Sequence, residues 1–267
     1  MNLLVVENLG KSFGGVRAIE GVSFAIQQGA VHSIIGPNGA GKTTLLNLLT
    51  GLVVPDAGRI RLDGVDLTGA APYRMAAAGL GRTFQNLQVF FNMSALENVM
   101  TGRHLREGDA LWAALLRLPS MVRSEIATRE RALQLLAHVG LADWAHTPAE
   151  AMPYGTLKRL EIARALAAEP RLLLLDEPAA GLNATEAQAI DALIKRLAGE
   201  GTTVILVEHN MKLVMGVSDH LLVLDQGRVL AEGTPQQIRA NPAVIEAYLG
   251  TAGEGAPADV TSEAAHA

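Results

Sequence analysis

A glycine-rich segment near the N-terminus constrains the fold of this chain more than any other feature. It contains Gly36, Pro37, Asn38, Gly39, Ala40, Gly41, Lys42, Thr43 and Thr44. The apolar run 31–35 precedes the segment and the leucine-rich stretch 45–49 follows it, so a strand leads into a glycine turn and then into a helix. This order is typical of a phosphate-binding loop in an α/β domain.

The residue types of this loop explain how it would hold a phosphate group. Glycines let the backbone curl until several N–H groups point at one anion, and the following helix presents its positive end to the same point. Lys42 supplies a charge for the β- and γ-phosphates, and the Thr43 hydroxyl supplies a ligand for Mg²⁺. We therefore predict that the residues from 36 to 44 bind a nucleotide and that Lys42 also takes part in catalysis.

A pair of carboxylates follows a second apolar run. The segment 172–175 consists of leucines, and Asp176 and Glu177 come directly after it. A continuous apolar run is typical of a parallel strand buried on both faces, and ligands bind at the carboxyl ends of such strands. Asp176 is therefore predicted to hold Mg²⁺. Glu177 is predicted to polarise the water that attacks the γ-phosphate, a role that contributes about 10²–10⁴-fold in rate.

Two further polar residues stand where core segments end. His209 lies two residues beyond the apolar run 203–207, which we expect to be another buried strand. Gln85 follows Phe84 just before a helical region, where a neutral amide can contact Mg²⁺ or the attacking water. We predict that both contribute to catalysis and that Gln85 is also a metal ligand.

The remaining pattern predicts strands alternating with helices. Short strands are expected at 3–6, 22–26 and 58–64, a hairpin at 221–230, and a largely helical region at 92–165. A helix at 125–139 is expected to end before Gly140. Its residues predicted to lie mainly on one face are Ile126, Leu133, Leu136, Ala137 and Val139. The alternation implies a doubly wound α/β core with a helical insert.

Composition excludes several classes of protein. The formal net charge of −5 argues against a nucleic-acid partner, which would usually require a basic face, and the chain has no cysteine for a disulfide or a metal site. We expect no signal peptide and no membrane span, since no stretch reaches ~18 apolar residues. The 49% of hydrophobic residues indicates either an alanine- and leucine-rich core or apolar surface covered by another subunit. The tail 251–267 is predicted to be disordered.

Taken together, the motifs resemble those of the ATPase subunits of ABC transporters. In chain order they are the loop 36–44, Phe84-Gln85, the glycine segment 152–159, Asp176-Glu177-Pro178 and His209. The resemblance implies a P-loop NTPase (RecA-like) α/β core with an antiparallel β subdomain and an inserted α-helical subdomain. It places the core with its β subdomain at 1–91 and 160–250, and the insert at 92–159. ATP and Mg²⁺ are the implied cofactors.

The resemblance also implies how two such subunits work together. In that family two ATPase subunits pair head to tail, and the glycine segment of each completes the ATP site of the other. Tyr154 and Gly155 are thereby expected to contact the partner's nucleotide, and Phe13 to stack on adenine. The segment 180–183 matches the loop that couples the two sites.

Finer features resemble the ATP-binding subunits of branched-chain amino-acid importers. They are Arg82-Thr83-Phe84-Gln85-Asn86, the insert at 104–130, the segment 207–215 and the ending 233–250. The implied partners are permease subunits, a second ATP-binding subunit that is a paralogue or a copy of this chain, and, indirectly, a solute-binding protein. The implied location is the cytoplasmic face of the plasma membrane, peripheral through the permease. Urea, amides and aromatic acids remain alternative cargoes.

Three departures from the family pattern leave a second function open. Pro153 stands where a serine is usual, Thr156 where glutamine is expected, and Asn183 where aspartate is common. The alternative function is an ATP-binding scaffold with weak hydrolysis. The apolar segment 87–93 is a candidate groove for a permease helix, or else part of the core of the insert.

Overall fold

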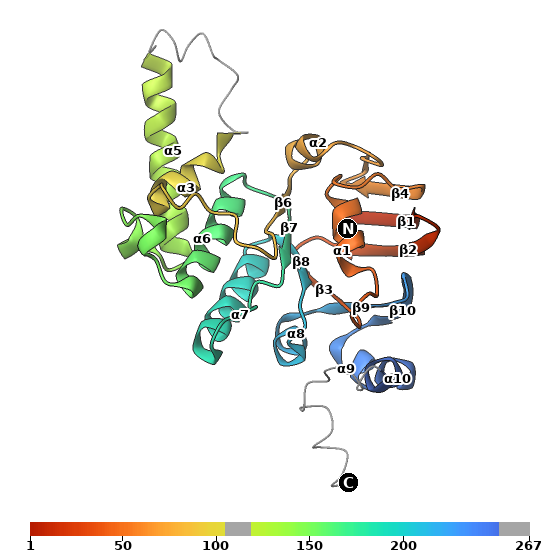
Figure 1. The fold of residues 1–267 in the computed structure, drawn as a ribbon. Helices are drawn as coiled ribbons and strands as arrows, with labels where there is room; N and C mark the ends of the chain where they lie inside the picture. Colours follow the sequence, from red (N-terminus) through yellow and green to blue (C-terminus); the bar gives the residue numbers. More distant parts are fainter. Residues whose placement is uncertain (105–118, 251–267) are drawn as a thin grey trace.

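The fold contains two β-sheets of different kinds. It is described here from a computed structural model, which covers residues 1–104 and 119–250 (Figure 1). The larger sheet has the order β10-β9-β3-β8-β7-β6, and its strands β3, β8, β7 and β6 run parallel. These strands are β3 (Val31–Ile35), β6 (Leu80–Arg82), β7 (Leu172–Asp176), β8 (Thr203–Val207), β9 (His220–Asp225) and β10 (Arg228–Gly233). The tail predicted to be disordered lies outside the described residues.

The second sheet is antiparallel and has the order β2-β1-β4-β5. Its strands are β1 (Asn2–Phe13), β2 (Val16–Gln27), β4 (Ala57–Leu62) and β5 (Val65–Asp66). Strands β1 and β2 are longer than the sequence pattern predicts. Their pairing contains register shifts, one of them between Val6 and Leu9, where Asn8 has φ +48°. Such a bulge breaks the alternation of apolar and polar residues, so the pattern conceals the continuation of the strand.

The helices lie on two sides of the larger sheet. They are α1 (Lys42–Leu49), α2 (Pro72–Ala77), α3 (Ala95–Thr101), α5 (Pro119–His138), α6 (Tyr154–Ala167), α7 (Ala184–Gly199), α8 (Met211–Val217), α9 (Pro235–Arg239) and α10 (Pro242–Gly250), with short 3₁₀ turns at Ala142–Trp144 and Ala149–Ala151. Helices α3, α5 and α6 gather on one side of the sheet, and α1 and the antiparallel sheet lie on the other (Figure 1). This arrangement confirms the predicted P-loop NTPase fold class.

Strand β7 shows why its sequence reads as one apolar run. Leu173 and Leu175 belong to the hydrophobic cluster that contains α3, α5, α6 and α7. Leu172 and Leu174 belong to the cluster beneath the antiparallel sheet. Both faces of the strand are thus covered, which removes the polar alternation of a half-exposed strand. The prediction of a fully buried parallel strand is confirmed.

Helix α5 ends as predicted, but only part of its predicted face is buried. Gly140 follows it with φ +74°, the left-handed conformation that closes many helices. Ile126, however, is 52% exposed and Leu133 is 37% exposed, so their assignment to a common packed face with Leu136 is wrong. Ala137 is exposed as well. The buried stripe consists of Thr128, Ala132, Leu135, Leu136 and Val139. Leu136 and Val139 are among the predicted residues, so the predicted face overlaps the buried stripe but is rotated away from it.

Candidate active site

The glycine-rich loop connects β3 to α1 and closes on its own lysine. Lys42 is the first residue of α1, and its Nζ donates hydrogen bonds to the Gly36 carbonyl at 2.7 Å and to the Pro37 carbonyl at 2.9 Å. Burial lowers the pKa of Lys42, and the charges of Glu177 and Asp176 oppose that shift. The ammonium group therefore lies inside the loop, and the carboxylates at the end of β7 favour its charged form.

Neighbouring strands hold the loop in shape. A Cβ on Gly36 would lie 2.1 Å from the Leu224 carbonyl oxygen of β9, and a Cβ on Gly41 would lie 2.6 Å from the Ala18 carbonyl oxygen of β2. Gly41 also has φ +100°. The turn between β9 and β10 braces the loop further, since the Gly227 N–H donates to the Ala40 carbonyl at 3.0 Å. At positions 36 and 41 the neighbouring backbone is so close that only glycine fits.

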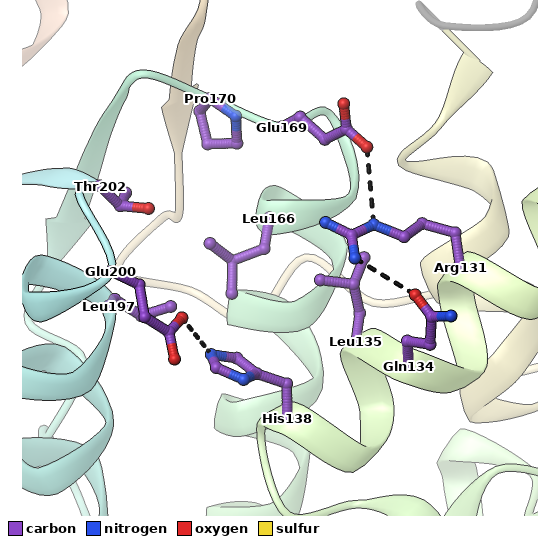
Figure 2. A pocket seen from close by; sticks show the side chains of 10 residues that line it. All are labelled: Arg131, Gln134, Leu135, His138, Leu166, Glu169, Pro170, Leu197, Glu200 and Thr202. Atoms are coloured by element: carbon purple, nitrogen blue, oxygen red, sulfur yellow. Dashed lines mark hydrogen bonds and ion pairs between the residues drawn. The ribbon is translucent and has the colours of Figure 1, made fainter.

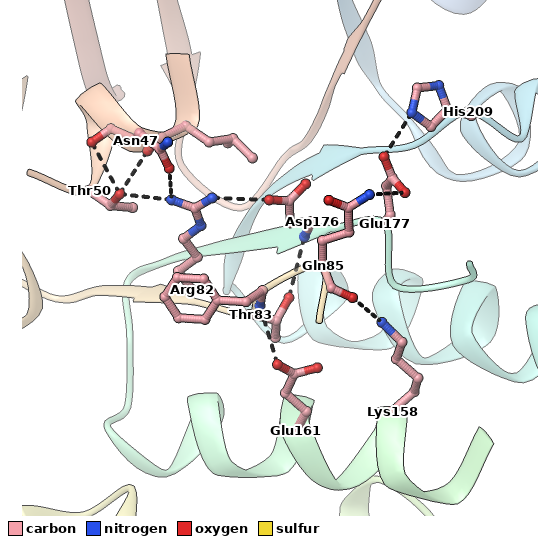
Figure 3. Close-up of polar contacts among 12 residues, drawn as sticks. Asn47, Thr50, Arg82, Thr83, Gln85, Lys158, Glu161, Asp176, Glu177 and His209 are labelled. Atoms are coloured by element: carbon pink, nitrogen blue, oxygen red, sulfur yellow. Dashed lines mark hydrogen bonds and ion pairs between the residues drawn. The ribbon is translucent and has the colours of Figure 1, made fainter. Parts of the chain in front are cut away.

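Three of the predicted catalytic residues meet at the carboxyl edge of the sheet. Strand β8 lies between β3 and β7, so residues that follow β7 and β8 come together beside the loop. His209 Nε2 lies 2.8 Å from Glu177 Oε1, and Gln85 Nε2 donates to Glu177 Oε2 at 3.2 Å (Figure 3). Glu177 has φ +49°, a conformation that costs a non-glycine residue about 1–3 kcal/mol. The carboxylate is thus oriented from two sides on a strained backbone.

Asp176 faces a partner that the sequence reasoning did not assign to the site. Its side chain is 8% exposed, and its Oδ2 accepts a hydrogen bond from Arg82 Nη2 at 3.0 Å. Arg82 is the last residue of β6, which pairs in parallel with β7. The only sequence signal was its place at the start of the segment that includes Gln85. An isolated arginine carries no information about its partner.

Helix α6 holds the loop that carries Gln85. Lys158 is 2% exposed, and its Nζ donates to the Gln85 carbonyl at 3.3 Å. Glu161 is 3% exposed, and its Oε1 accepts the N–H groups of Phe84 at 3.2 Å and of Gln88 at 3.3 Å. Figure 3 shows the contact of Lys158 with Gln85 and one of the two contacts of Glu161. The sequence reasoning did not find these contacts, because their partners are backbone groups far away along the chain.

Glu208 is a further buried carboxylate that the sequence reasoning missed. It is 4% exposed, and its oxygens accept the N–H groups of Ala179 at 2.8 Å and of His209 at 3.2 Å. Burial raises the pKa of Glu208, and its backbone hydrogen bonds oppose that shift. The side chain links the loop after β7 to the loop after β8. Its position directly after a buried strand was the available signal.

The residues expected to contact a partner's nucleotide lie at the start of α6. Pro153 is the N-cap and makes no capping hydrogen bond through its side chain. Tyr154 is 45% exposed, whereas Gly155 is buried against α7, where an added Cβ would lie 2.4 Å from Glu186 Oε1. This first turn of α6 thus presents one exposed aromatic ring and a backbone packed against the core.

Phe13, the residue expected to stack on adenine, ends β1 and is 48% exposed. The Lys11 ammonium lies 5.4 Å from the centroid of its ring. The hairpin of β1 and β2 reaches the phosphate loop through Ala18, as described above. The structure therefore places the ring on the same hairpin that braces the loop.

A cavity of about 390 Å³ lies away from these groups, between α5 and the ends of α6 and α7 (Figure 2). Pro170, which precedes β7, lines it, so it lies toward the amino ends of the strands. Its charged side chains face one another. Arg131 lies 3.5 Å from Glu169, and His138 lies 3.2 Å from Glu200. The cavity therefore belongs to the junction of the insert with the core and not to the nucleotide loop.

Comparisons with known proteins agree with the geometry. The profile of the ABC transporter family matches residues 19–180, and a profile described as branched-chain amino acid ATP-binding cassette transporter matches residues 228–254. BraF of Pseudomonas aeruginosa, a high-affinity branched-chain amino acid transport ATP-binding protein, is 47% identical over 94% of this chain and 98% of BraF. LivG of Escherichia coli, which has the same description, is 44% identical with the same coverage.

Solved structures show the same fold. The ADP conformation of MJ1267, an ATP-binding cassette of an ABC transporter, matches with a TM-score of 0.81 and 33% identity, covering 94% of this chain and 99% of that one. A dimeric post-hydrolysis cassette, MJ0796 bound to ADP and phosphate, matches with a TM-score of 0.73 and 26% identity, covering 87% and 98%. The chain therefore belongs to the ABC transporter family, and it is an ATP-binding subunit with ATPase activity.

Proposed function

We propose that this chain hydrolyses ATP to drive the import of branched-chain amino acids through a membrane permease. The observation that carries the proposal is the position of Glu177 at the strand edge, where Gln85 and His209 hold its carboxylate. The similarity to BraF and LivG over almost their whole length supports the choice of cargo. Urea, amides and aromatic acids are the other cargoes to compare.

The donor atoms at this edge fit Mg²⁺. Asp176 offers a carboxylate, Thr43 an exposed hydroxyl in the first turn of α1, and Gln85 an amide oxygen. Within 1–104 and 119–250 no three His, Asp or Glu side chains cluster to hold a metal on their own. Mg²⁺ is commonly held by one or two carboxylates together with substrate phosphates, so a single carboxylate beside a phosphate loop suits it. The bound ion would neutralise charge on the transferring phosphoryl group.

The side chains of this site have distinct parts in hydrolysis. Lys42 leaves its two carbonyl partners to bind the β- and γ-phosphates, and the N–H groups of the loop surround them. Glu177 accepts a proton from the attacking water, and His209 and Gln85 fix the direction of its carboxylate. The magnitude expected of such a base is about 10²–10⁴-fold in rate.

The working unit in this proposal is a pair of cassettes on the cytoplasmic side of a permease. Phe13 stacks on adenine, and Tyr154 and Gly155 complete the site of the second cassette, which is a paralogue of this chain or a copy of it. Phe90 and Phe91, which are 45% and 48% exposed, meet the permease. In the described residues no helix is long and apolar enough to span a bilayer. Attachment to the membrane through the permease is part of the proposal.

Reconstitution tests this function directly. The complex that co-purifies with the tagged chain is placed in proteoliposomes, and phosphate release and leucine uptake are measured with urea, an amide and an aromatic acid as competing solutes. Glu177→Gln is expected to lower both rates 10²-fold or more while ATP still binds. Glu150→Gln, at an exposed position, is the matched control. Equal phosphate release by Glu177→Gln and the natural chain would refute the catalytic assignment and favour a scaffold.

A further inference from the structure

Arg82 connects two parts of the site that are far apart in the sequence. Its side chain is 7% exposed. One terminal nitrogen donates to Asn47 Oδ1 at 2.8 Å and to Thr50 Oγ1 at 3.0 Å, and the other donates to Asp176 Oδ2 at 3.0 Å (Figure 3). The guanidinium carbon also lies 4.9 Å from the centroid of the Phe84 ring. A single planar group is thus fixed on three oxygens and an aromatic face.

The acceptors of Arg82 belong to the elements that hold the phosphates and the metal. Asn47 and Thr50 lie at the end of α1, the helix that begins at Lys42, and Asp176 ends β7. The guanidinium has a rigid fork of donors, so its contacts define an orientation as well as a charge. With Oδ2 of Asp176 engaged, the other carboxylate oxygen is left for the metal or its water.

Stability alone is a weak reason for such a contact. Replacing a buried ion pair by apolar side chains of similar volume is often neutral or even stabilising, because desolvation offsets the attraction. Hydrogen-bond partners of metal ligands, by contrast, commonly change metal affinity or activity 10–100-fold when they are removed. Arg82 has the position of such a partner.

We propose that Arg82 is a positioning residue for the metal site: it orients the Asp176 carboxylate toward Mg²⁺ and keeps that carboxylate in register with the phosphate loop through α1. This inference rests on the Mg²⁺ role proposed above. It adds a residue whose effect reaches the metal only through Asp176.

The test measures metal affinity rather than turnover. A fluorescent ATP analogue is bound to the purified chain with and without Mg²⁺, and the Mg²⁺ midpoint is determined for Arg82→Met and Arg82→Lys. Arg82→Met is expected to raise the midpoint 10–100-fold while analogue affinity in EDTA stays within about twofold. Arg82→Lys keeps the charge but loses the forked donors, so its Mg²⁺ midpoint is expected to lie between those of the natural chain and of Arg82→Met. The matched control is Arg103→Met, which removes a 3.0 Å ion pair with Glu169.

A double-mutant cycle isolates the path through Asp176. In an Asp176→Asn background, Arg82→Met is expected to leave the Mg²⁺ midpoint unchanged within about twofold, because the carboxylate that it orients is gone. An equal shift in both backgrounds would overturn the proposal, and so would an unshifted midpoint in Arg82→Met. If Arg82→Met does not fold, Thr50→Val removes one anchor, and its midpoint must rise in the same direction for the proposal to stand.

The outcomes separate this inference from the proposed function. If the natural chain binds the analogue in a Mg²⁺-dependent way and Arg82→Met has the same Mg²⁺ midpoint, only the role of Arg82 is refuted. Analogue binding by the natural chain that is independent of Mg²⁺ refutes the metal role itself, and with it this inference.

Discussion

Glu161 is the point at which a single substitution is expected to release the Gln85 loop. Its Oε1 accepts hydrogen bonds from two N–H groups, those of Phe84 and Gln88, at 3.2 and 3.3 Å. Glu161→Leu keeps the apolar packing of α6 but leaves both donors without this acceptor. Glu161→Gln keeps an oxygen in the same place and is the matched control.

The magnitude follows from these two hydrogen bonds. A hydrogen bond to a charged group contributes about 1.5–3 kcal/mol, and the long distances place both bonds at the lower end. Burial raises the pKa of Glu161, while the two N–H groups and Lys158 oppose that shift, so desolvation of the carboxylate subtracts from the gain. A net cost of about 2–3 kcal/mol for Glu161→Leu remains. It corresponds to a roughly 30- to 160-fold greater population of the open loop.

Hydrogen exchange measured by mass spectrometry reports this population directly. The peptide that spans Phe84 to Gln88 is expected to exchange faster by that factor in Glu161→Leu, and by less than about fivefold in Glu161→Gln. Phosphate release is expected to fall in parallel, because Gln85 then no longer orients Glu177. Glu130→Leu, at an exposed position on α5, controls for a general effect of the substitution. Unchanged exchange of this peptide in a folded Glu161→Leu variant would refute the reasoning.

Three further substitutions test other parts of the structure. Gly41→Ala forces a Cβ to within 2.6 Å of a carbonyl oxygen and is expected to lower ATP affinity at least tenfold by calorimetry, whereas Gly199→Ala, whose Cβ meets nothing within 4 Å, leaves it unchanged. Burial and a neighbouring histidine lower the pKa of His32 from 6.5 to about 4, so the unfolded chain binds more protons between these values and stability falls as the pH drops below 6.5. Between pH 7.5 and pH 5, the free energy of unfolding in urea should fall by about 2 kcal/mol less for His32→Gln than for the natural chain, and an equal fall in both would contradict this. Phe90→Ser is expected to abolish leucine uptake while ATP binding by the isolated subunit is retained; loss of folded protein would instead assign Phe90 to the core.

The phosphate loop and the edge of the sheet were predictable because their signals are local. The glycine spacing within 36–44 predicts the loop by itself, and the leucines before Asp176 predict a strand buried on both faces. Since the carboxyl ends of parallel strands share one edge, the meeting of Glu177 and His209 follows from those two runs.

Other contacts were beyond the reach of sequence patterns. Arg82 and Asp176 are 94 positions apart, and the acceptors and donors joined to Lys158 and Glu161 are backbone groups 73 to 77 positions away. A polar residue in a sequence does not show which backbone group it will bind. The packed face of α5 was predicted only in part, since its buried stripe includes Thr128 and its exposed side carries Ile126.

Strand order also determines when this molecule can first fold during synthesis. β3 leads directly into the phosphate loop, yet its neighbours in the sheet are β8 and β9, whose residues begin at Thr203 and His220. On a ribosome adding about 5–20 residues per second, the interval of about 170 residues between β3 and β8 lasts roughly 10–35 s. During this interval both edges of the apolar strand β3 lack the strands with which they pair in the folded protein. A nascent chain halted before Thr203 should therefore need a chaperone and should not bind ATP. Tight ATP binding by such a fragment would contradict this order of folding.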